Sequence, residues 1–301
     1  MVCATPEARP DVCKVWLVTG ATAGLGLELT RNVLARGDKV IATGRSDSQF
    51  NELLSDASID QTRLRTSTLD VTVPFDDIKR QVDTAIDAWG RIDVLVNNAG
   101  ICYLGATEEI GAEGMMHMMQ TNFVGVLNVT NAVLPHMRSR REGSIVFMGS
   151  RSAFRNQIEG LGPYAASKAA LHSYAETLSV EMESFDINVL IVIPGIFRTK
   201  MNSQRRAGAP LPGYETVHAG VDAMIKSVAT VPKSDPKLGM DVLVDVVRGE
   251  GRAAGRRSLP LWLFLGEDCM HDVRARLDHM GSIMDEWGFV GTRLGLPEAA
   301  Q

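Results

Sequence analysis

The stretch Val15-Trp16-Leu17-Val18-Thr19-Gly20-Ala21-Thr22-Ala23-Gly24-Leu25-Gly26 decides the fold. Its first four residues form a continuous apolar run, which is typical of a strand buried on both faces. Three glycines follow, and apolar residues spaced three and four apart then predict a helix that ends at Arg36-Gly37. A strand, a glycine turn and a helix in this order predict a phosphate-binding cradle, because glycines let a pyrophosphate approach the backbone and the helix N-terminus attracts its charge.

The glycine spacing is Gly-x3-Gly-x-Gly, which differs from the Gly-x-Gly-x-x-Gly of the common dinucleotide fingerprint. An ordinary glycine-rich turn is the alternative. The strand before the glycines and the helix after them favour the cradle.

The rest of the chain repeats the alternation of strand and helix. We expect strands at 39–43, 63–69, 92–96, 144–148, 188–193 and 259–266, and helices at 72–89 (with Pro74 in its first turn), 106–136, from 164 past 182, 219–229, 235–248 and 267–287. This rhythm predicts an α/β, Rossmann-like, doubly wound parallel sheet of about seven strands with helices on both faces. Residues 1–12 are expected to be a flexible N-terminus and 13–301 a single domain, with a substrate lid at 198–234 and a carboxyl-terminal extension at 235–301.

Length, net charge and amino-acid composition limit the classes of protein to which this chain can belong. With 301 residues, 45% of them hydrophobic, the chain can form one large domain with a substantial core. A net charge of -5 argues against a nucleic-acid or anionic-membrane partner, and no apolar run reaches the roughly 18 residues of a membrane span. The four cysteines are widely spaced and the six histidines lack ligand spacing, so we expect no metal, no disulfide framework and a reduced, cytoplasmic compartment.

The end of the second strand predicts the coenzyme. The sequence there is Thr43-Gly44-Arg45, with no carboxylate for the ribose 2′-hydroxyl of NAD(H) and a guanidinium suited to the 2′-phosphate of NADP(H). NADP(H) is therefore expected rather than NAD(H). The alternative is that Arg45 only points to solvent and backbone groups hold the ribose. Asp70, at the end of the third strand, could accept a hydrogen bond from the adenine amino group.

Proton transfer is expected at Tyr164 and Lys168, which a helix places on one face. A cation one turn away favours the phenolate, so Tyr164 could exchange a proton with an alcohol or carbonyl. The alternative is a half-buried tyrosine beside a solvated lysine. The serine at 150, directly after an apolar strand, and Asn97-Asn98-Ala99-Gly100, where a cofactor could lie against the main chain, favour the first interpretation.

These motifs occur in one order along the chain: Thr19-Gly20-x-x-x-Gly24-x-Gly26, Asp70, Asn97-Asn98-Ala99-Gly100, Asn122, Ser150, Tyr164-x-x-x-Lys168 and Pro194-Gly195-x-x-x-Thr199. In this order the sequence resembles the classical short-chain dehydrogenase/reductases over about residues 12–200. Each motif alone is weak, whereas the complete series is specific.

The resemblance implies roles for four catalytic residues. Tyr164 would be the general acid/base and Ser150 would polarise the substrate oxygen. Lys168 would bind the nicotinamide ribose, and Asn122 would anchor a water in a proton relay. Together with the motifs above it implies that the coenzyme contacts Gly20, Thr22, Gly24, Leu25, Gly26, Gly44, Arg45, Asp70, Val71, Asn98, Ala99, Gly100, Tyr164, Lys168, Pro194, Gly195, Ile196 and Thr199.

Two departures from the family pattern stand out. Ala23 occupies a position where NADP-preferring relatives often carry a basic residue, so the coenzyme prediction rests on Arg45. Ser152 is a second serine near Ser150. We prefer Ser150 as the catalytic residue because it directly follows the strand.

The function implied is an NADP(H)-dependent oxidoreductase that interconverts a carbonyl and an alcohol on a small hydrophobic substrate. Candidate substrate residues are Ser152, Phe154, Tyr103, Leu161 and Phe197. An imine reductase and a catalytically silent NADP(H)-binding sensor or scaffold are the alternatives. The resemblance also implies a homodimer or homotetramer, in which the helices at 106–136 and 164–182 pair across twofold axes. The carboxyl-terminal extension can block one such contact.

Overall fold

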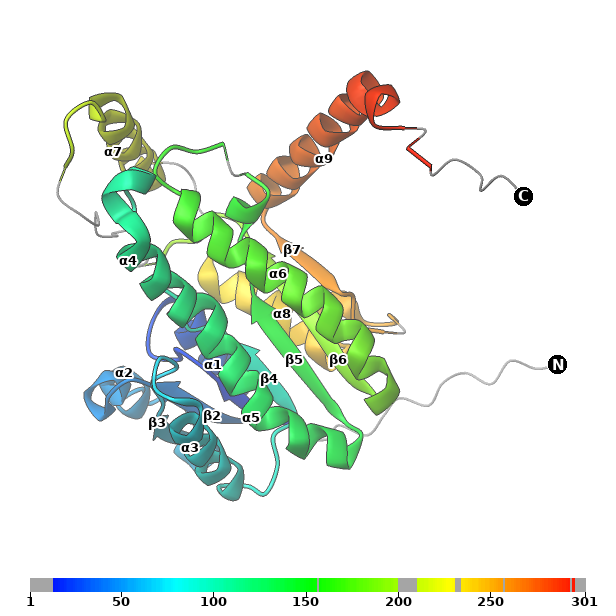
Figure 1. The fold of residues 1–301 in the computed structure, drawn as a ribbon. Helices are drawn as coiled ribbons and strands as arrows, with labels where there is room; N and C mark the ends of the chain where they lie inside the picture. Colours follow the sequence, from blue (N-terminus) through cyan, green and yellow to red (C-terminus); the bar gives the residue numbers. More distant parts are fainter. Residues whose placement is uncertain are drawn as a thin grey trace, which may run out of the picture.

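The core of the protein is a seven-stranded sheet in which every neighbouring pair of strands is parallel (Figure 1). A computed structural model describes residues 13–155, 157–199, 210–230, 234–256, 258–292 and 294–295. The strand order is β3-β2-β1-β4-β5-β6-β7. The strands are β1 (Val15–Val18), β2 (Lys39–Gly44), β3 (Leu64–Thr68), β4 (Val94–Asn97), β5 (Gly143–Met148), β6 (Ile187–Pro194) and β7 (Trp262–Leu265). The doubly wound parallel sheet predicted from the sequence is confirmed.

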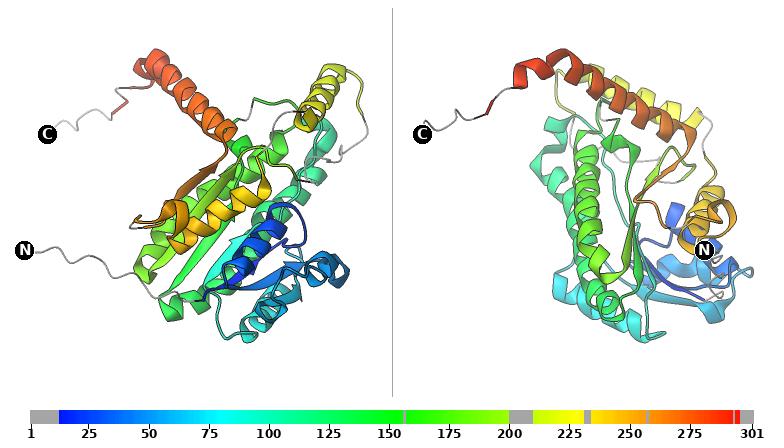
Figure 2. Two further views of the ribbon diagram at one scale, coloured as in Figure 1. Left: turned by 180° about the vertical axis from the view of Figure 1, so that it is seen from behind. Right: turned by 90° about the vertical axis from the view of Figure 1, so that its right-hand side faces the viewer.

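Helices cover both faces of this sheet (Figure 2). The helices are α1 (Gly24–Ala35), α2 (Asn51–Leu54), α3 (Phe75–Asp87), α4 (Thr107–Met119), α5 (Gly125–Arg140), α6 (Gly162–Met182), α7 (Glu215–Thr230), α8 (Pro236–Arg248) and α9 (Glu267–Trp287). One apolar cluster joins α3, α5 and α6 to one face, and a second joins α1 and α8 to the other.

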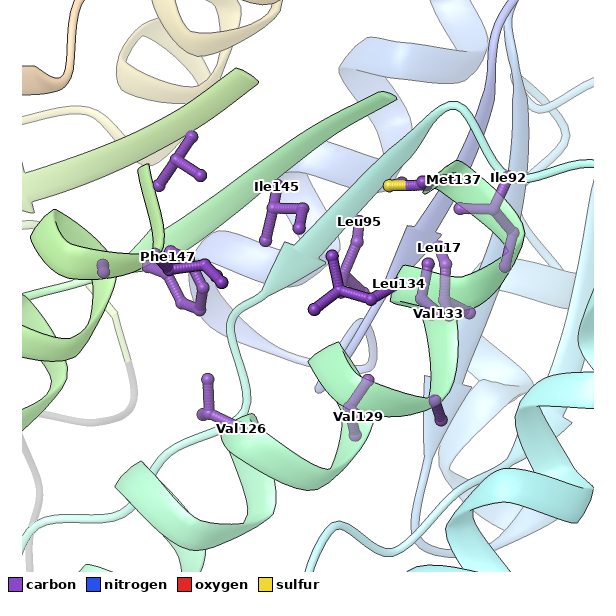
Figure 3. Packing of buried hydrophobic residues seen from close by; sticks show 14 of the residues in the cluster. Leu17, Ile92, Leu95, Val126, Val129, Val133, Leu134, Met137, Ile145 and Phe147 are labelled. Carbon is purple, nitrogen blue, oxygen red and sulfur yellow. The ribbon is translucent and has the colours of Figure 1, made fainter. Parts of the chain in front are cut away.

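Alternation along the strands explains the two clusters. Leu17 belongs to the first cluster, while its neighbours Trp16 and Val18 belong to the second, because successive strand side chains point to opposite faces. Figure 3 shows the first cluster, in which Leu17, Leu95, Ile145 and Phe147 lie near residues of α5: Val126, Val129, Val133, Leu134 and Met137. The parallel sheet is therefore buried on both faces, as the apolar strand sequences indicate.

The strand order reverses direction between β1 and β4. The connection after β1 runs toward β2 and the connection after β4 runs toward β5, so the loops at the carboxyl ends of these strands separate. In open parallel sheets, ligands bind in the crevice at such a switch point. The predicted site residues follow these strand ends.

Several helices and strands begin or end at residues other than those predicted from the sequence. Pro74 is the N-cap of α3 rather than a first-turn residue, since its ψ of 151° is extended. The expected 106–136 helix consists of α4, a π-helical turn at Gln120–Val124 and α5, and Gly111 (φ 59°) interrupts α4. The last strand begins after Pro260, because proline has no N–H to donate to a strand ladder. The short helix expected at 219–229 begins earlier, at Glu215, whereas α8 and α9 agree with the prediction.

Two predicted segments lie wholly or partly outside the described residues. The N-terminal segment 1–12 is outside, and so are 200–209 and 231–233 of the expected lid. The described part of 198–234 includes α7. Among the described helices, none combines the length and apolarity needed to cross a membrane.

Candidate active site

The glycine cradle begins where β1 ends. Gly20 and Gly24 have φ values of 63° and 57°, a left-handed conformation that favours glycine. A Cβ on Gly26 would overlap with the Gly20 carbonyl and lie 2.5 Å from Asn98 Nδ2. The N-cap of α1, Ala23, makes no side-chain capping bond, so the first N–H groups of this helix are available to an anion.

The loop after β4 holds the cradle in place. Asn98 Nδ2 donates to the carbonyl oxygens of Thr19 and Gly20 at 2.9 and 3.0 Å. Thr19 Oγ1 accepts from the backbone N–H groups of Asn98 and Ala99 at 2.9 and 3.0 Å. A Cβ on Gly20 would lie 3.0 Å from Ala99 Cα, so the two loops touch through their backbones. These bonds explain why small and amide-bearing residues occupy both strand ends.

The end of β2 offers an exposed cation. Arg45 is exposed, and within the described part of the chain its guanidinium makes no hydrogen bond or ion pair. Its backbone N–H donates to Gln49 Oε1 at 3.0 Å, which orders the turn. A Cβ on Gly44 would come within 2.8 Å of Thr22 Cγ2, so this strand end packs against the cradle.

Asp70 lies at the next strand end. Its Oδ1 accepts from the backbone N–H and hydroxyl of Thr72 at 2.9 and 2.7 Å. The half-buried side chain is therefore oriented by its own turn. Val71, the next residue, is 6% exposed, and a Cβ on Gly125 would overlap with its carbonyl.

Tyr164, Lys168 and Ser150 come together at the end of β5. Tyr164 lies in the first turn of α6, and the Ser150 side chain is near enough to its hydroxyl to lower its pKa. Lys168 is 5% exposed, and its Nζ donates to the Met148 carbonyl at 2.7 Å. Ser152 also joins this group, because its Oγ lies 2.7 Å from Ser150 Oγ. The catalytic roles of Tyr164, Lys168 and Ser150 stay a prediction.

Burial is the largest influence on the pKa values of this group. It raises the pKa of Tyr164 above its ordinary value, the nearby Cys102 thiol raises it further, and the Ser150 side chain acts in the opposite direction. Burial also lowers the pKa of Lys168 to about 8. The pKa of Tyr164 is therefore raised in this structure, whereas the sequence analysis expected Lys168 to favour the phenolate.

His172 is a site residue that sequence reasoning missed. It lies one turn after Lys168 on α6, and its Nε2 accepts from the backbone N–H of Ser150 at 3.2 Å. Burial lowers the pKa of His172 to about 3, so the imidazole stays neutral and keeps this acceptor. A Cβ on Gly149 would overlap with Nε2. The spacing of residues 164, 168 and 172 on one helix face was the available signal.

Asn122 lies in the π-helical turn between α4 and α5. Its Nδ2 donates to the Ile101 carbonyl at 2.8 Å and to Ser167 Oγ at 3.0 Å, and its Oδ1 accepts from the Ile101 N–H at 2.8 Å. The side chain thus braces the loop after β4 against α6. Single π-helical turns are frequent at functional sites.

The first turns of α9 hold the loop after β6, which sequence reasoning also missed. Asp268 Oδ2 accepts from the Ile196 N–H at 2.7 Å, and a Cβ on Gly195 would overlap with this carboxylate. Asp272 forms a close ion pair with Arg151, directly after Ser150, and Asp268 lies 3.5 Å from the same guanidinium. We call Asp268, Asp272 and Arg151 the α9 clamp. In the sequence, Asp268 resembled an ordinary first-turn acid of a helix.

An apolar cluster surrounds the ring of Tyr164. It contains Cys102, Leu104 and Val221, with Leu161 and the α7 residues Val217, Met224 and Ile225 packed beside them. Of the candidate substrate residues, Leu161 belongs to this cluster and Ser152 lies beside Ser150. Tyr103 turns toward α4, where its hydroxyl lies 2.8 Å from His117 Nδ1.

Two candidate substrate residues pack against core clusters. Phe197 is 5% exposed and packs in the second core cluster, where a Cβ on Gly239 of α8 would overlap with its ring. Phe154 is partly buried beside the first cluster and packs against His172 and Trp262, at ring-centroid distances of 5.6 and 5.8 Å. Contact of either residue with a substrate stays a prediction.

Comparison with known proteins agrees with this geometry. Residues 14–210 match the family model described as short chain dehydrogenase. An oxidoreductase named BOA17 from Botryotinia fuckeliana is 29% identical over 276 residues, which cover 91% of this chain and 96% of that protein. A short-chain dehydrogenase structure from Streptomyces avermitilis superposes with a TM-score of 0.81 at 30% identity, covering 95% of this chain and 100% of that one.

A second solved structure carries a coenzyme. An actinorhodin polyketide ketoreductase with NADPH superposes with a TM-score of 0.68 at 29% identity, covering 85% of this chain and 97% of that one. The chain therefore belongs to the short-chain dehydrogenase family and is an oxidoreductase.

Proposed function

We propose that this protein is an NADP(H)-dependent oxidoreductase that interconverts a carbonyl and an alcohol on a small hydrophobic substrate. The observation that carries the proposal is the gathering of Tyr164, Ser150 and the buried Lys168 at the end of β5, at the same sheet edge as the glycine cradle. A proton donor, a second hydroxyl and a cation are thereby gathered where a coenzyme would end.

The direction of the Tyr164 pKa favours reduction. Because burial raises it, the hydroxyl keeps its proton at neutral pH and can donate that proton to a carbonyl oxygen. Ser150 would hold the same oxygen, and His172 keeps the serine backbone in place. When bound, NADP(H) would supply or take up the hydride. Lys168, fixed on the Met148 carbonyl, is positioned to hold a ribose hydroxyl as well.

The residues present fit such a coenzyme. The left-handed glycines, the uncapped start of α1 and the backbone contact between Gly20 and Ala99 suit a pyrophosphate. The exposed Arg45 guanidinium, at a strand end without a carboxylate, supports NADP(H) over NAD(H). The NADPH-bound ketoreductase is a relative with the same kind of coenzyme.

The apolar cluster beside Tyr164 supports the proposal of a hydrophobic substrate. Leu161, Cys102 and the α7 residues Val217 and Met224 offer apolar contacts, and Ser152 adds one hydroxyl. Sites of this composition bind apolar molecules and orient them with few polar groups.

The proposal treats residues 13–301 as one catalytic domain that works in the cytoplasm as a homodimer or homotetramer. Widely spaced cysteines support the reduced compartment. Cys102 and Cys269, the buried ones, are free thiols.

The decisive experiment follows NADPH oxidation at its near-ultraviolet absorbance with a panel of alkyl and aryl ketones. Replacing Tyr164→Phe is expected to lower kcat/KM by roughly 10²–10⁴-fold, because general acid catalysis is lost. The affinity for NADPH, measured by fluorescence titration, should change little. Tyr174→Phe is the matched control, since this tyrosine lies on the same helix and contacts Phe123 and Phe147 through its ring.

Unchanged turnover in Tyr164→Phe would refute the mechanism. Binding of NADPH without turnover of any ketone would favour the silent sensor or scaffold, and turnover of imines alone would favour the imine reductase. Running the assay with NADH tests the coenzyme: equal kcat/KM with both coenzymes would refute the role given to Arg45.

A further inference from the structure

Ser152 is a second buried serine directly beside Ser150. It lies in the short 3₁₀ turn Arg151–Ala153 that follows β5, and it is 6% exposed, against 9% for Ser150. Its Oγ lies 2.7 Å from Ser150 Oγ, and its backbone N–H donates to Ser150 Oγ at 3.2 Å. Ser152 therefore contacts the Ser150 hydroxyl through two separate groups.

The hydrogen-bonding capacity of a hydroxyl limits how these two contacts are made. A serine oxygen has one hydrogen to donate and two lone pairs that accept. The N–H of Ser152 fills one lone pair of Ser150 Oγ. Between the two oxygens either hydroxyl can donate. If Ser150 donates, its only hydrogen is used. If Ser152 donates, both lone pairs of Ser150 are filled and the Ser150 hydrogen is directed at a third group.

The surroundings of the two serines favour Ser152 as the donor. The Ser150 side chain lowers the pKa of Tyr164, which is the effect of a hydroxyl hydrogen directed at the phenol oxygen. Among the described residues, Ser152 Oγ has no hydrogen-bond partner besides Ser150. With Ser152 as donor, both buried hydrogens have an acceptor. With Ser150 as donor, the Ser152 hydrogen has none, and a buried hydroxyl that donates to nothing is costly.

The main chain of Ser150 is fixed from the other side. Its backbone is extended, with φ -161° and ψ 142°, and its N–H donates to His172 Nε2 at 3.2 Å. A Cβ on the preceding Gly149 would overlap with the same nitrogen, so strand end and imidazole are in close contact. His172 thus fixes the backbone of Ser150, and Ser152 holds its hydroxyl.

We propose that Ser152 is a positioning residue that donates its hydroxyl hydrogen to Ser150 Oγ and thereby directs the Ser150 hydrogen at the reacting oxygen. This inference rests on the proposed function and deepens it. Two donors to Ser150 Oγ also polarise its O–H bond, which makes it a stronger donor to a carbonyl oxygen that gains negative charge. Ser152 acts on the reaction through Ser150.

The kinetic test follows NADPH-dependent ketone reduction in Ser150→Ala, Ser152→Ala and the double variant. Ser150→Ala is expected to lower kcat by about 10²-fold or more, because a donor to the developing oxyanion is lost. Ser152→Ala should lower kcat roughly tenfold at nearly constant KM for the ketone, because the Ser150 hydrogen is no longer directed. The double variant should be no slower than Ser150→Ala, since Ser152 acts through Ser150.

Ser179→Ala is the control, because this serine also lies on the helix of Tyr164 and its hydroxyl donates to the Glu176 carbonyl. Its kcat should equal that of wild type. A further tenfold loss in the double variant would show that Ser152 acts independently of Ser150 and would overturn the proposal. A rise in KM alone in Ser152→Ala would also overturn it, and so would a larger loss of kcat in Ser152→Ala than in Ser150→Ala.

Neutron diffraction from a wild-type crystal exchanged into D2O gives the hydrogen positions without any turnover. The deuterium between the two oxygens is expected to belong to Ser152, with the Ser150 deuterium directed toward Tyr164. A map in which Ser150 donates to Ser152 would overturn the proposal even if ketones are reduced. A wild type that reduces no ketone would refute the proposed function instead, and the neutron map would still decide the direction of this hydrogen bond.

Discussion

The glycine cradle and the α9 clamp position their parts of the site by different means. The cradle is built from backbone groups and glycines within the first hundred residues, with Asn98 as its main side-chain tie. The clamp uses carboxylates about seventy residues after the Gly195-Ile196 loop that they hold. Both ties are long-range in sequence, 79 residues from Thr19 to Asn98 and 72 from Ile196 to Asp268, so the difference lies in the groups used: backbone and amide groups hold the cradle, whereas carboxylates hold the loop after β6.

The cradle and the clamp should also differ in how well they tolerate amino-acid substitutions. At Gly20 and Gly26 the cradle has no space for an added carbon, because the nearest atoms are other backbone and amide atoms. The clamp distributes its bonds over Asp268, Asp272 and Arg151, so loss of one leaves others in place. Substitutions in the cradle are therefore expected to cost more.

The largest effect is expected from Gly26→Ala. The new methyl group overlaps with the Gly20 carbonyl and meets Asn98 Nδ2, so the cradle must open at a cost of about 3 kcal/mol. Fluorescence titration should show a loss of NADPH affinity on the order of 100-fold. Gly288→Ala is the control, since φ there is -58° and an added Cβ meets nothing within 4 Å. Equal affinity in the two variants would contradict the tight packing of the cradle.

An intermediate effect concerns Lys168, which lies between the two regions. Its pKa falls to about 8 in the folded protein, below its usual value in an unfolded chain. Between pH 8 and about pH 10 the unfolded chain holds a proton that the folded chain has released, so the free energy of unfolding should rise with pH, by up to about 3 kcal/mol.

Urea denaturation of wild type and Lys168→Met over this pH range measures that rise. The difference in the free energy of unfolding between the two proteins should increase with pH. A constant difference would show that burial does not govern this lysine.

The smallest effect is expected from Asp268→Asn. The amide keeps the size of the carboxylate but loses its charge, which weakens the bond to the Ile196 N–H by about 1 kcal/mol. KM for NADPH should rise roughly fivefold at nearly constant kcat, because the loop and not the proton donor is affected. Asp278→Asn, an exposed change on the same helix, is the control. A fall in kcat with KM unchanged would show that Asp268 does not act on coenzyme binding.

Sequence patterns predicted much of the fold and the central residues of the site. Continuous apolar strands, glycine turns and capped helices are local signals, so β1, α1, α8 and α9 appear close to where they were expected. Tyr164, Lys168 and Ser150 also meet as predicted, because residues at neighbouring strand ends and one helix face are brought together by any doubly wound sheet.

Side-chain environment was harder to predict than element order. Phe197 and Phe154 look like pocket residues in sequence, and the structure packs Phe197 inside one core cluster and Phe154 beside the other. The Tyr164 pKa was predicted from its nearest charge, whereas the amount of water excluded around it decides the direction.

By itself, the sequence determined the order of strands and helices, the glycines of the first strand-to-helix turn and the chemical types present at the site, because these depend on neighbours within a few turns. Only the tertiary structure decided which carboxylates of α9 reach Arg151 and Ile196, which ring faces the core, and which face of α9 stays uncovered. Those outcomes depend on distances between segments far apart in the chain, and such distances exist only once the sheet has formed.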